Sequence, residues 1–340
     1  MHTLRFLGLL LALTGFSGPL AHGDAPQPIT VRVHVLNFDP VVEAGSGQRL
    51  HQQYGWNDPH KLAEQYAADV KEVSYGLVQF KITGWDNLDE FPVKVDGFRY
   101  TREQFAECWK AKGGWHQPDP ADYPAIIAQH RLAERVEAGE FDEVWWMGFP
   151  YCGFAESAMA GRGAFVINGP VYDAPEVKCK RAFAIMGFNN ERGPAEMIHN
   201  LGHRTEATMS RVFGGWKAEV LDSDWARFAA NAHQSSGVAA VGSCHYPPNG
   251  VRDYDYANPL AVESSADDWL DYPKLTGKKA RVTCETWGGP DYQRNYLKWW
   301  FTRLPHSSGV NTDNGRLNDW WAYIFQFNDF DALGKPREQP

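Results

Sequence analysis

The residues best suited to chemistry lie in one short segment, residues 196–206, which reads Glu-Met-Ile-His-Asn-Leu-Gly-His-Arg-Thr-Glu. His199 and His203 are four positions apart, and Glu196 and Glu206 flank them. On a helix these four side chains share an arc of about 80°, because each residue turns the helix by about 100°. Two imidazoles at this spacing can bind one ion, and a neighbouring carboxylate can be a ligand, a positioning group or a proton acceptor. The segment predicts a site for a divalent metal, with zinc favoured.

The same segment also fits a helix that binds no metal. Its glutamates, histidines and Arg204 lie at the spacing of helical ion pairs, which need no ion to form. In that case the whole chain could be a secreted binding protein without catalysis.

The motif Ile-His199-Asn200-Leu-Gly-His203 resembles the His-Glu-Leu-Gly-His helix of the zincin metallopeptidases. The elements expected before it, over residues 29–211, follow a similar order: a strand, a long helix, two strands and a short strand between glycines. The resemblance implies that His199 and His203 bind zinc. In the zincins the glutamate after the first histidine is the general base, whereas this chain has Asn200 at that position.

Asn200 alters the chemistry that the resemblance implies, because a neutral amide cannot accept the proton of a water molecule. A hydrolase would then need another base, for which Glu196 and Glu206 are the nearest carboxylates, or peptidase activity would be changed or lost. The third metal ligand is open as well. The candidates are Glu206, Glu219 and His245 in a Cys-His-Tyr-Pro-Pro loop, of which Glu206 and His245 are preferred.

A carbohydrate-active enzyme is a different class that fits the composition. The chain has 14 Trp, 14 Tyr and 19 Phe, and aromatic rings stack on sugar rings. Glu191 and Glu285 each follow an expected strand and could be the two carboxylates of a glycoside hydrolase, with Glu156 as a further candidate. A closed barrel is not indicated, because eight strand and helix units cannot be counted. Adjacent tryptophans are expected to place one ring of each pair in the core and the other elsewhere, at residues 145–146, 299–300 and 320–321.

Residues 1–23 have the layout of a cleaved secretory signal, with Arg5, an apolar stretch and a small-residue exit. They predict a secreted or periplasmic protein without a membrane anchor. Together with the metal motif, this predicts a hydrolase of an extracellular polymer, with a peptide favoured over a polysaccharide. In such a compartment cysteines favour disulfides, and the chain has five, none in a Cys-x-x-Cys pair: Cys108, Cys152, Cys179, Cys244 and Cys284.

Charge and composition exclude some classes of protein. The 33 basic and 42 acidic residues give a net charge of -9 without long runs, which argues against a nucleic-acid partner. A hydrophobic content of 43% with 22% charged residues is typical of a folded chain rather than a disordered one.

The elements that must position these residues follow from the hydrophobic pattern. Strands are expected at 29–38, 77–85, 141–149, 161–169, 182–188 and 280–284. Helices are expected at 58–74, 101–112, 122–138, 193–211, 223–233, 291–303 and 317–327. The pattern predicts an α/β (α+β) fold, for which the resemblance implies a zincin-like N-terminal half with a mixed sheet and a central motif helix. We expect a domain of residues 24–215 and a helical or irregular C-terminal subdomain, residues 216–340, packed on the first.

Overall fold

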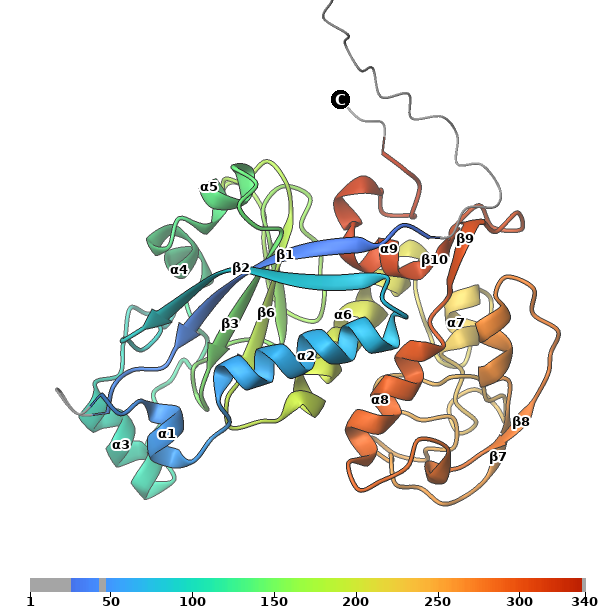
Figure 1. Cartoon of the computed structure of the whole chain (residues 1–340), viewed down its shortest axis with the longest axis horizontal. Coiled ribbons are helices and arrows are strands. Elements are labelled where there is room, and N and C mark those ends of the chain that lie inside the picture. The colour runs from blue at the N-terminus through green and yellow to red at the C-terminus, as the bar shows by residue number, and fades with distance from the viewer. Residues whose placement is uncertain (1–25, 43–46, 338–340) are drawn as a thin grey trace, which may run out of the picture.

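A mixed six-stranded sheet forms the centre of the computed structural model, which describes residues 26–42 and 47–337 (Figure 1). The strands lie in the order β2-β1-β3-β6-β4-β5. The first four are mutually parallel, β4 is antiparallel to β6, and β5 is parallel to β4. Their bounds are β1 Ile29–Phe38, β2 Val78–Leu88, β3 Glu143–Gly148, β4 Ser157–Ala160, β5 Val171–Tyr172 and β6 Phe183–Asn189. The predicted α/β fold class is confirmed.

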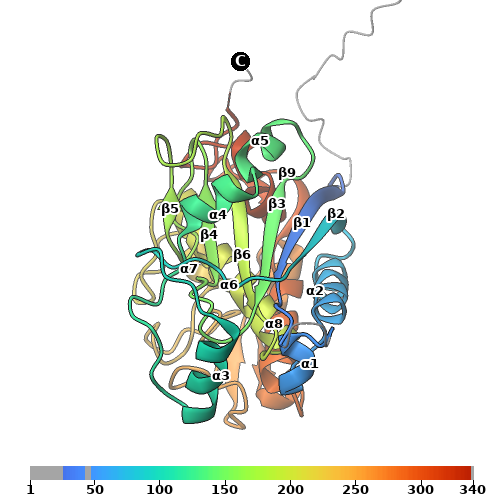
Figure 2. The ribbon, with the colours of Figure 1, turned by 90° about the vertical axis from the view of Figure 1, so that its left-hand side faces the viewer.

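Helices cover both faces of the sheet and enclose two hydrophobic cores (Figure 2). The helices α2 (Pro59–Val73) and α6 (Pro194–Val212) pack against one face. The helices α4 (Tyr123–Gln129) and α5 (Leu132–Glu137) pack against the other. The short helix α1 (Leu50–Tyr54) and the helix α3 (Arg102–Ala111) lie at one end of the molecule (Figure 1).

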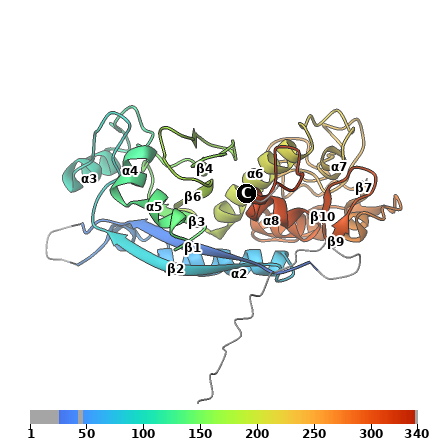
Figure 3. The same ribbon diagram turned by 90° about the horizontal axis from the view of Figure 1, so that it is seen from above.

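Residues after α6 form short elements that pack against that helix. Figure 3 shows α6 between the sheet and this C-terminal part, and α6 contacts both α8 and α9. The helices are α7 Asp224–Phe228, α8 Tyr292–Thr302 and α9 Trp320–Phe325, with 3-10 turns η1 Ala266–Asp271, η2 Cys284–Thr286 and η3 Phe327–Asp329. Two short antiparallel pairs join β7 Val262–Ser264 to β8 Ala280–Val282, and β9 His306–Val310 to β10 Leu317–Asp319.

The motif helix α6 begins and ends where its sequence indicates. Pro194 occupies the first turn, where its missing N–H costs no helical hydrogen bond. Gly214 and Gly215 follow the helix with φ of 78° and 130°, which favours glycine over other residues. Arg204 ties the helix to β3 through a 2.6 Å ion pair with Glu143, and both side chains are almost completely buried. This pair fixes the rotation of α6 against the sheet.

Both rings of every adjacent tryptophan pair are buried, so the expectation that one ring of each pair lies outside the core is wrong. On β3, Trp145 enters the core beneath α2 and α6, while Trp146 enters the core on the opposite face. Successive strand residues point to opposite faces, and helices cover both faces of this sheet. The aromatic content is therefore largely core packing.

Several expected elements differ in the structure. The strand expected at 161–169 is instead β4, because Gly161 and Gly163 have φ of 89° and 84° and turn the chain away. The helix expected at 122–138 is divided in two at Arg131, whose φ is 51°. The helix expected at 223–233 ends at Phe228, and residues 317–327 form β10 followed by α9.

All five cysteines lie in the described part of the chain, and all are free thiols. The expected disulfides are therefore not formed in this structure. Each of the four buried thiols contacts another group; Cys152 Sγ, for example, accepts the N–H of Phe149, and Cys244 lies against His199. The expected signal segment, residues 1–23, lies outside the described residues. Among the helices of the described ranges, none has the length and apolar character needed to cross a bilayer.

Candidate metal centre

The Nε2 atom of His245 lies close to the Nε2 atoms of both helix histidines. His245 Nε2 lies 3.0 Å from His203 Nε2 and 3.3 Å from His199 Nε2. His199 and His203 are neighbours on one face of α6, whereas His245 comes from a loop in the C-terminal part. Nitrogen ligands of a tetrahedral zinc ion, at 2.0–2.1 Å from the metal, are about 3.3 Å from one another. Both distances from His245 Nε2 therefore match those between ligands of one small divalent ion.

Each of these imidazoles is contacted at its other nitrogen, Nδ1, by a different polar side chain. The contacts join His203 to Glu206 Oε2 at 3.1 Å, His245 to Asp253 Oδ1 at 3.5 Å, and His199 to Cys244 Sγ at 3.5 Å. An acceptor at Nδ1 holds the proton on that nitrogen and leaves the lone pair of Nε2 free. The carboxylate contact of His203 is the one that histidine ligands of metal ions commonly have.

Glu206 lies behind His203, on the Nδ1 side of its ring. Its Oε2 contacts His203 Nδ1, and its Oε1 accepts the backbone N–H of Cys244 at 2.7 Å. Both oxygens are therefore used in holding His203 and the loop that carries His245. Glu206 therefore contacts His203 from behind, whereas His245 Nε2 lies beside the Nε2 atoms of both helix histidines.

Cys244 is an alternative third ligand, because its Sγ and ring nitrogens of His199 and His203 all lie within 4.8 Å of one another. The Sγ atom, however, faces His199 Nδ1 and the backbone oxygen of His199, at 3.5 and 3.6 Å. His199 Nε2 faces His245 instead. The geometry therefore favours three histidines, with the buried thiol as a neighbour of His199.

The pKa values of the two helix histidines shift in opposite directions. Burial, together with the charges on His203 and His245, lowers the pKa of His199 to about 3. Burial also acts to lower the pKa of His203, but the hydrogen bond and charge of Glu206, with the charge of Glu156, outweigh it and raise the pKa overall. His199 is thus a neutral imidazole throughout the physiological pH range.

Gly202 allows the loop that carries Cys244 and His245 to approach α6 closely. A Cβ atom at this position would lie 2.6 Å from Cys244 Sγ and 3.4 Å from Cys244 Cβ. Only glycine leaves room for the loop to pass this close to α6. Because His245 follows Cys244 directly, this contact also sets where the third imidazole lies.

Glu156 is a carboxylate that faces the ligand nitrogens. Its Oε2 lies 3.9 Å from His203 Nε2 and accepts an N–H from the side chain of Asn168. It lies in the loop before β4, which crosses so close to β6 that a Cβ at Gly187 would clash with the carbonyl oxygen of Ala155. From the sequence, Glu156 is a candidate only for a glycoside hydrolase, since no spacing connects it with the motif helix.

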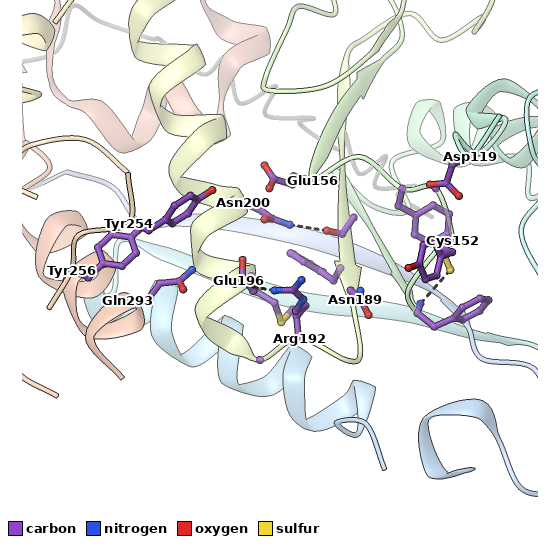
Figure 4. Close-up of a pocket in the computed structure, with 18 residues that line it drawn as sticks. Asp119, Cys152, Glu156, Asn189, Arg192, Glu196, Asn200, Tyr254, Tyr256 and Gln293 are labelled. Atoms are coloured by element: carbon purple, nitrogen blue, oxygen red, sulfur yellow. Dashed lines mark hydrogen bonds and ion pairs between the residues drawn. The ribbon is translucent and has the colours of Figure 1, made fainter. Parts of the chain in front are cut away.

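A cavity of about 650 Å³ opens beside the centre, and Glu156, Glu196 and Asn200 line it (Figure 4). The Asn200 side chain donates an N–H to the carbonyl oxygen of Gly187 on β6 at 2.8 Å. Glu196 pairs with Arg192 at 3.8 Å, within the same cavity. Of the two bases expected from the sequence, Glu196 therefore faces the cavity and Glu206 does not line it.

The remaining candidate carboxylates are not brought together. Glu191 is exposed and pairs with Arg192, and Glu285 is exposed beside Cys284. Glu219 is exposed in a turn after α6. None of the three lines the cavity. The structure thus gives Glu191 and Glu285 no shared site of the kind a glycoside hydrolase needs.

Asp253 and Tyr254 are site residues that the sequence did not reveal. Tyr254 packs against the His245 ring with a centroid distance of 4.3 Å and lines the cavity. Both residues lie on a loop without helical or strand periodicity, so no local pattern distinguishes them.

No protein-family model, no curated protein and no solved structure matches the chain.

Proposed function

We propose that this protein is a metal-dependent hydrolase whose divalent ion, zinc in first place, is held by His199, His203 and His245. The observation that carries the proposal is the position of His245 Nε2, 3.0 Å from His203 Nε2 and 3.3 Å from His199 Nε2, with each Nδ1 contacted by a separate polar group. A salt-bridged helix without a metal would not need the third imidazole from a distant loop. An ion at this centre would polarise a carbonyl group and a water molecule, which is the chemistry of metal-dependent amide and ester hydrolysis.

Within this proposal Glu156 is the proton acceptor that replaces the missing glutamate at position 200. Its carboxylate lies 3.9 Å from His203 Nε2, faces the cavity and is oriented by Asn168. Glu196, the alternative, is paired with Arg192. Asn200 has a structural role instead, because its side-chain N–H donates to the carbonyl oxygen of Gly187 on β6.

The order of the elements supports a zincin-like interpretation. The elements β1, α2, β2, β3 and the antiparallel β4 precede β6 and the motif helix α6, as the sequence resemblance implies. The signal-like N-terminus favours a secreted or periplasmic enzyme that acts on an extracellular polymer. A peptide and an acylated polysaccharide both contain the carbonyl centre that such a site attacks.

Metal analysis of untagged protein, purified without added metal, tests the proposal. We expect close to one equivalent of zinc or another divalent ion by inductively coupled plasma mass spectrometry. His203→Ala and His245→Ala should lose most of this metal, because each removes one of three ligands. Cys244→Ser and Asn200→Ala should keep it, because neither side chain supplies a ligand atom at the centre.

His233→Ala is a matched control, because it removes a histidine outside the site. Circular dichroism of each variant separates loss of metal from loss of fold. Folded wild-type protein without metal would refute the proposal. Metal retained in His245→Ala but lost in Cys244→Ser would replace the third ligand by the thiol.

A further inference from the structure

The sheet edge beside the metal centre is already paired. The outer side of β4 bonds to β5 and to the chain before it: Met159 N–H donates to the carbonyl of Pro170 at 3.3 Å, and Gly161 N–H to that of Tyr172 at 3.0 Å. Gly169 fits this contact closely, since a Cβ there would clash with the carbonyl oxygen of Ser157. An extended peptide binds a sheet by adding a strand to a free edge. Residues 169–172 occupy the position that such a peptide would take on β4.

Two exposed tyrosines line the cavity, and both have unusual backbones. Tyr151 and Tyr254 are 43% and 53% exposed, with φ of 66° and 58°. Non-glycine residues rarely adopt this left-handed conformation, and such strain gathers at functional sites. Tyr151 stacks on Trp115 at 3.7 Å and Tyr254 packs against His245 at 4.3 Å, so each ring is held with one face covered. In Figure 4 Tyr254 and Cys152, the neighbour of Tyr151, lie on opposite sides of the cavity.

The charges that line the cavity are mostly compensated. Asp119 pairs with Lys94 at 2.8 Å, and Glu196 pairs with Arg192 at 3.8 Å. Glu156, in contrast, has a neutral amide and an imidazole as its neighbours. Among the described residues that line it, the cavity therefore offers no free cation to an anionic ligand.

Amide side chains provide the remaining polar groups of the cavity, from Asn189, Asn200 and Gln293. The Nε2 atom of Gln293 is buried and has no hydrogen-bond partner among the described residues. A buried donor of this kind is normally satisfied, so a ligand acceptor is the expected partner. Stacking rings combined with neutral amide groups suit a sugar, which has apolar ring faces and many hydroxyl groups.

We propose that the substrate is an acylated sugar polymer, whose rings stack on Tyr151 and Tyr254 while an N-acyl group lies at Glu156, the cavity residue beside His203. This inference rests on the proposed hydrolase function and names its substrate class. In the reaction the oxygen of water adds to the acyl carbon, and the bond between that carbon and the sugar nitrogen breaks. Glu156 takes a proton from the water and passes it to the leaving nitrogen. The products are a carboxylic acid and an amino sugar.

Isothermal titration calorimetry with oligomers of N-acetylglucosamine tests the proposal on the full chain, both as purified and after removal of metal. We expect Tyr151→Ala to weaken binding by about twofold to tenfold, the range that aromatic contacts of about 0.5–1.5 kcal/mol give. Tyr75→Ala is the matched control. Tyr75 is also an exposed tyrosine with left-handed backbone, φ 54°, but it stacks on His306 outside the cavity. Its replacement should leave the affinity unchanged.

Equal binding by Tyr151→Ala and Tyr75→Ala would overturn the inference, and so would binding of an unacylated peptide in place of the oligomers. Metal present without oligomer binding would refute this inference alone. Ring-dependent binding by folded protein that contains no metal as purified would refute the proposed hydrolase and the acyl transfer to water. The two proposals therefore fail in distinguishable ways.

Discussion

Replacing Gly202 by alanine perturbs the contact through which the motif helix meets the loop of the third histidine. The new Cβ would lie 2.6 Å from Cys244 Sγ and 3.9 Å from Leu297 Cδ2. Because the thiol is completely buried between α6 and its own loop, it has no open space to move into. The loop itself must shift, and His245 shifts with it.

Two opposing effects determine how much Gly202→Ala changes the free energy of unfolding. Overpacking a buried contact costs about 1–3 kcal/mol, whereas alanine is about 1 kcal/mol better than glycine inside a helix. We therefore expect Gly202→Ala to lower the free energy of unfolding by about 0–2 kcal/mol in the wild-type background. In the Cys244→Ala background the clashing Sγ atom is absent, and the same change should be neutral or stabilising. The coupling between the two positions should thus reach about 1–3 kcal/mol.

Urea unfolding followed by tryptophan fluorescence measures this cycle on four proteins: wild type, each single variant and the double variant. Metal content of the same proteins gives a second reading, which should fall in Gly202→Ala because His245 is displaced. If Gly202→Ala changes the free energy of unfolding equally with and without the thiol, the close approach is not what requires glycine here.

Two further predictions concern buried charges away from the centre. Arg204→Met should lower the free energy of unfolding by about 3–5 kcal/mol, because it leaves the Glu143 carboxylate buried without its ion-pair partner. Adding Glu143→Gln should recover part of this loss. Chemical unfolding measures both variants, and no recovery in the double variant would contradict the reasoning. Burial raises the pKa of Asp319 to about 6, despite backbone hydrogen bonds from Trp321 and Ala322. The folded state therefore holds this proton more tightly than the unfolded state, so its contribution to stability is complete below about pH 4 and is lost as the pH rises to about 6. Asp319→Asn should remove that decline from the melting temperature measured against pH, and an unchanged decline would assign it to other groups.

The sequence predicts the parts of the fold whose pattern is local. The alternation at 29–38 and the helical spacing at 193–211 give β1 and α6 (Pro194–Val212) nearly to the residue. Strand β4 escapes prediction because its four residues are all buried and lack alternation. The burial of both tryptophans of β3 escapes prediction for a related reason, since a pattern within one strand does not show that helices cover both faces.

The sequence likewise predicts only the part of the candidate site that lies within one local motif. The motif identifies His199 and His203, which lie on one helix, and leaves Glu206 and His245 as equal alternatives. Only the tertiary structure separates them, because the loop of His245 is placed by long-range contacts such as that with Gly202. Glu156 approaches the centre from the loop before β4, and no spacing along the chain records that approach.

The distance along the chain between the three histidines has a consequence for folding. His199 and His245 are separated by 46 positions, and the chain between them includes the end of α6, α7 and the loops that follow. An ion bound to both would act as a reversible crosslink that closes this loop. For a covalent crosslink of that length, the loss of disorder in the unfolded chain is worth about 4 kcal/mol in the chain-entropy model. The five cysteines are free thiols in this structure. The three imidazoles with their ion would then restrict the unfolded chain as disulfides do in other proteins.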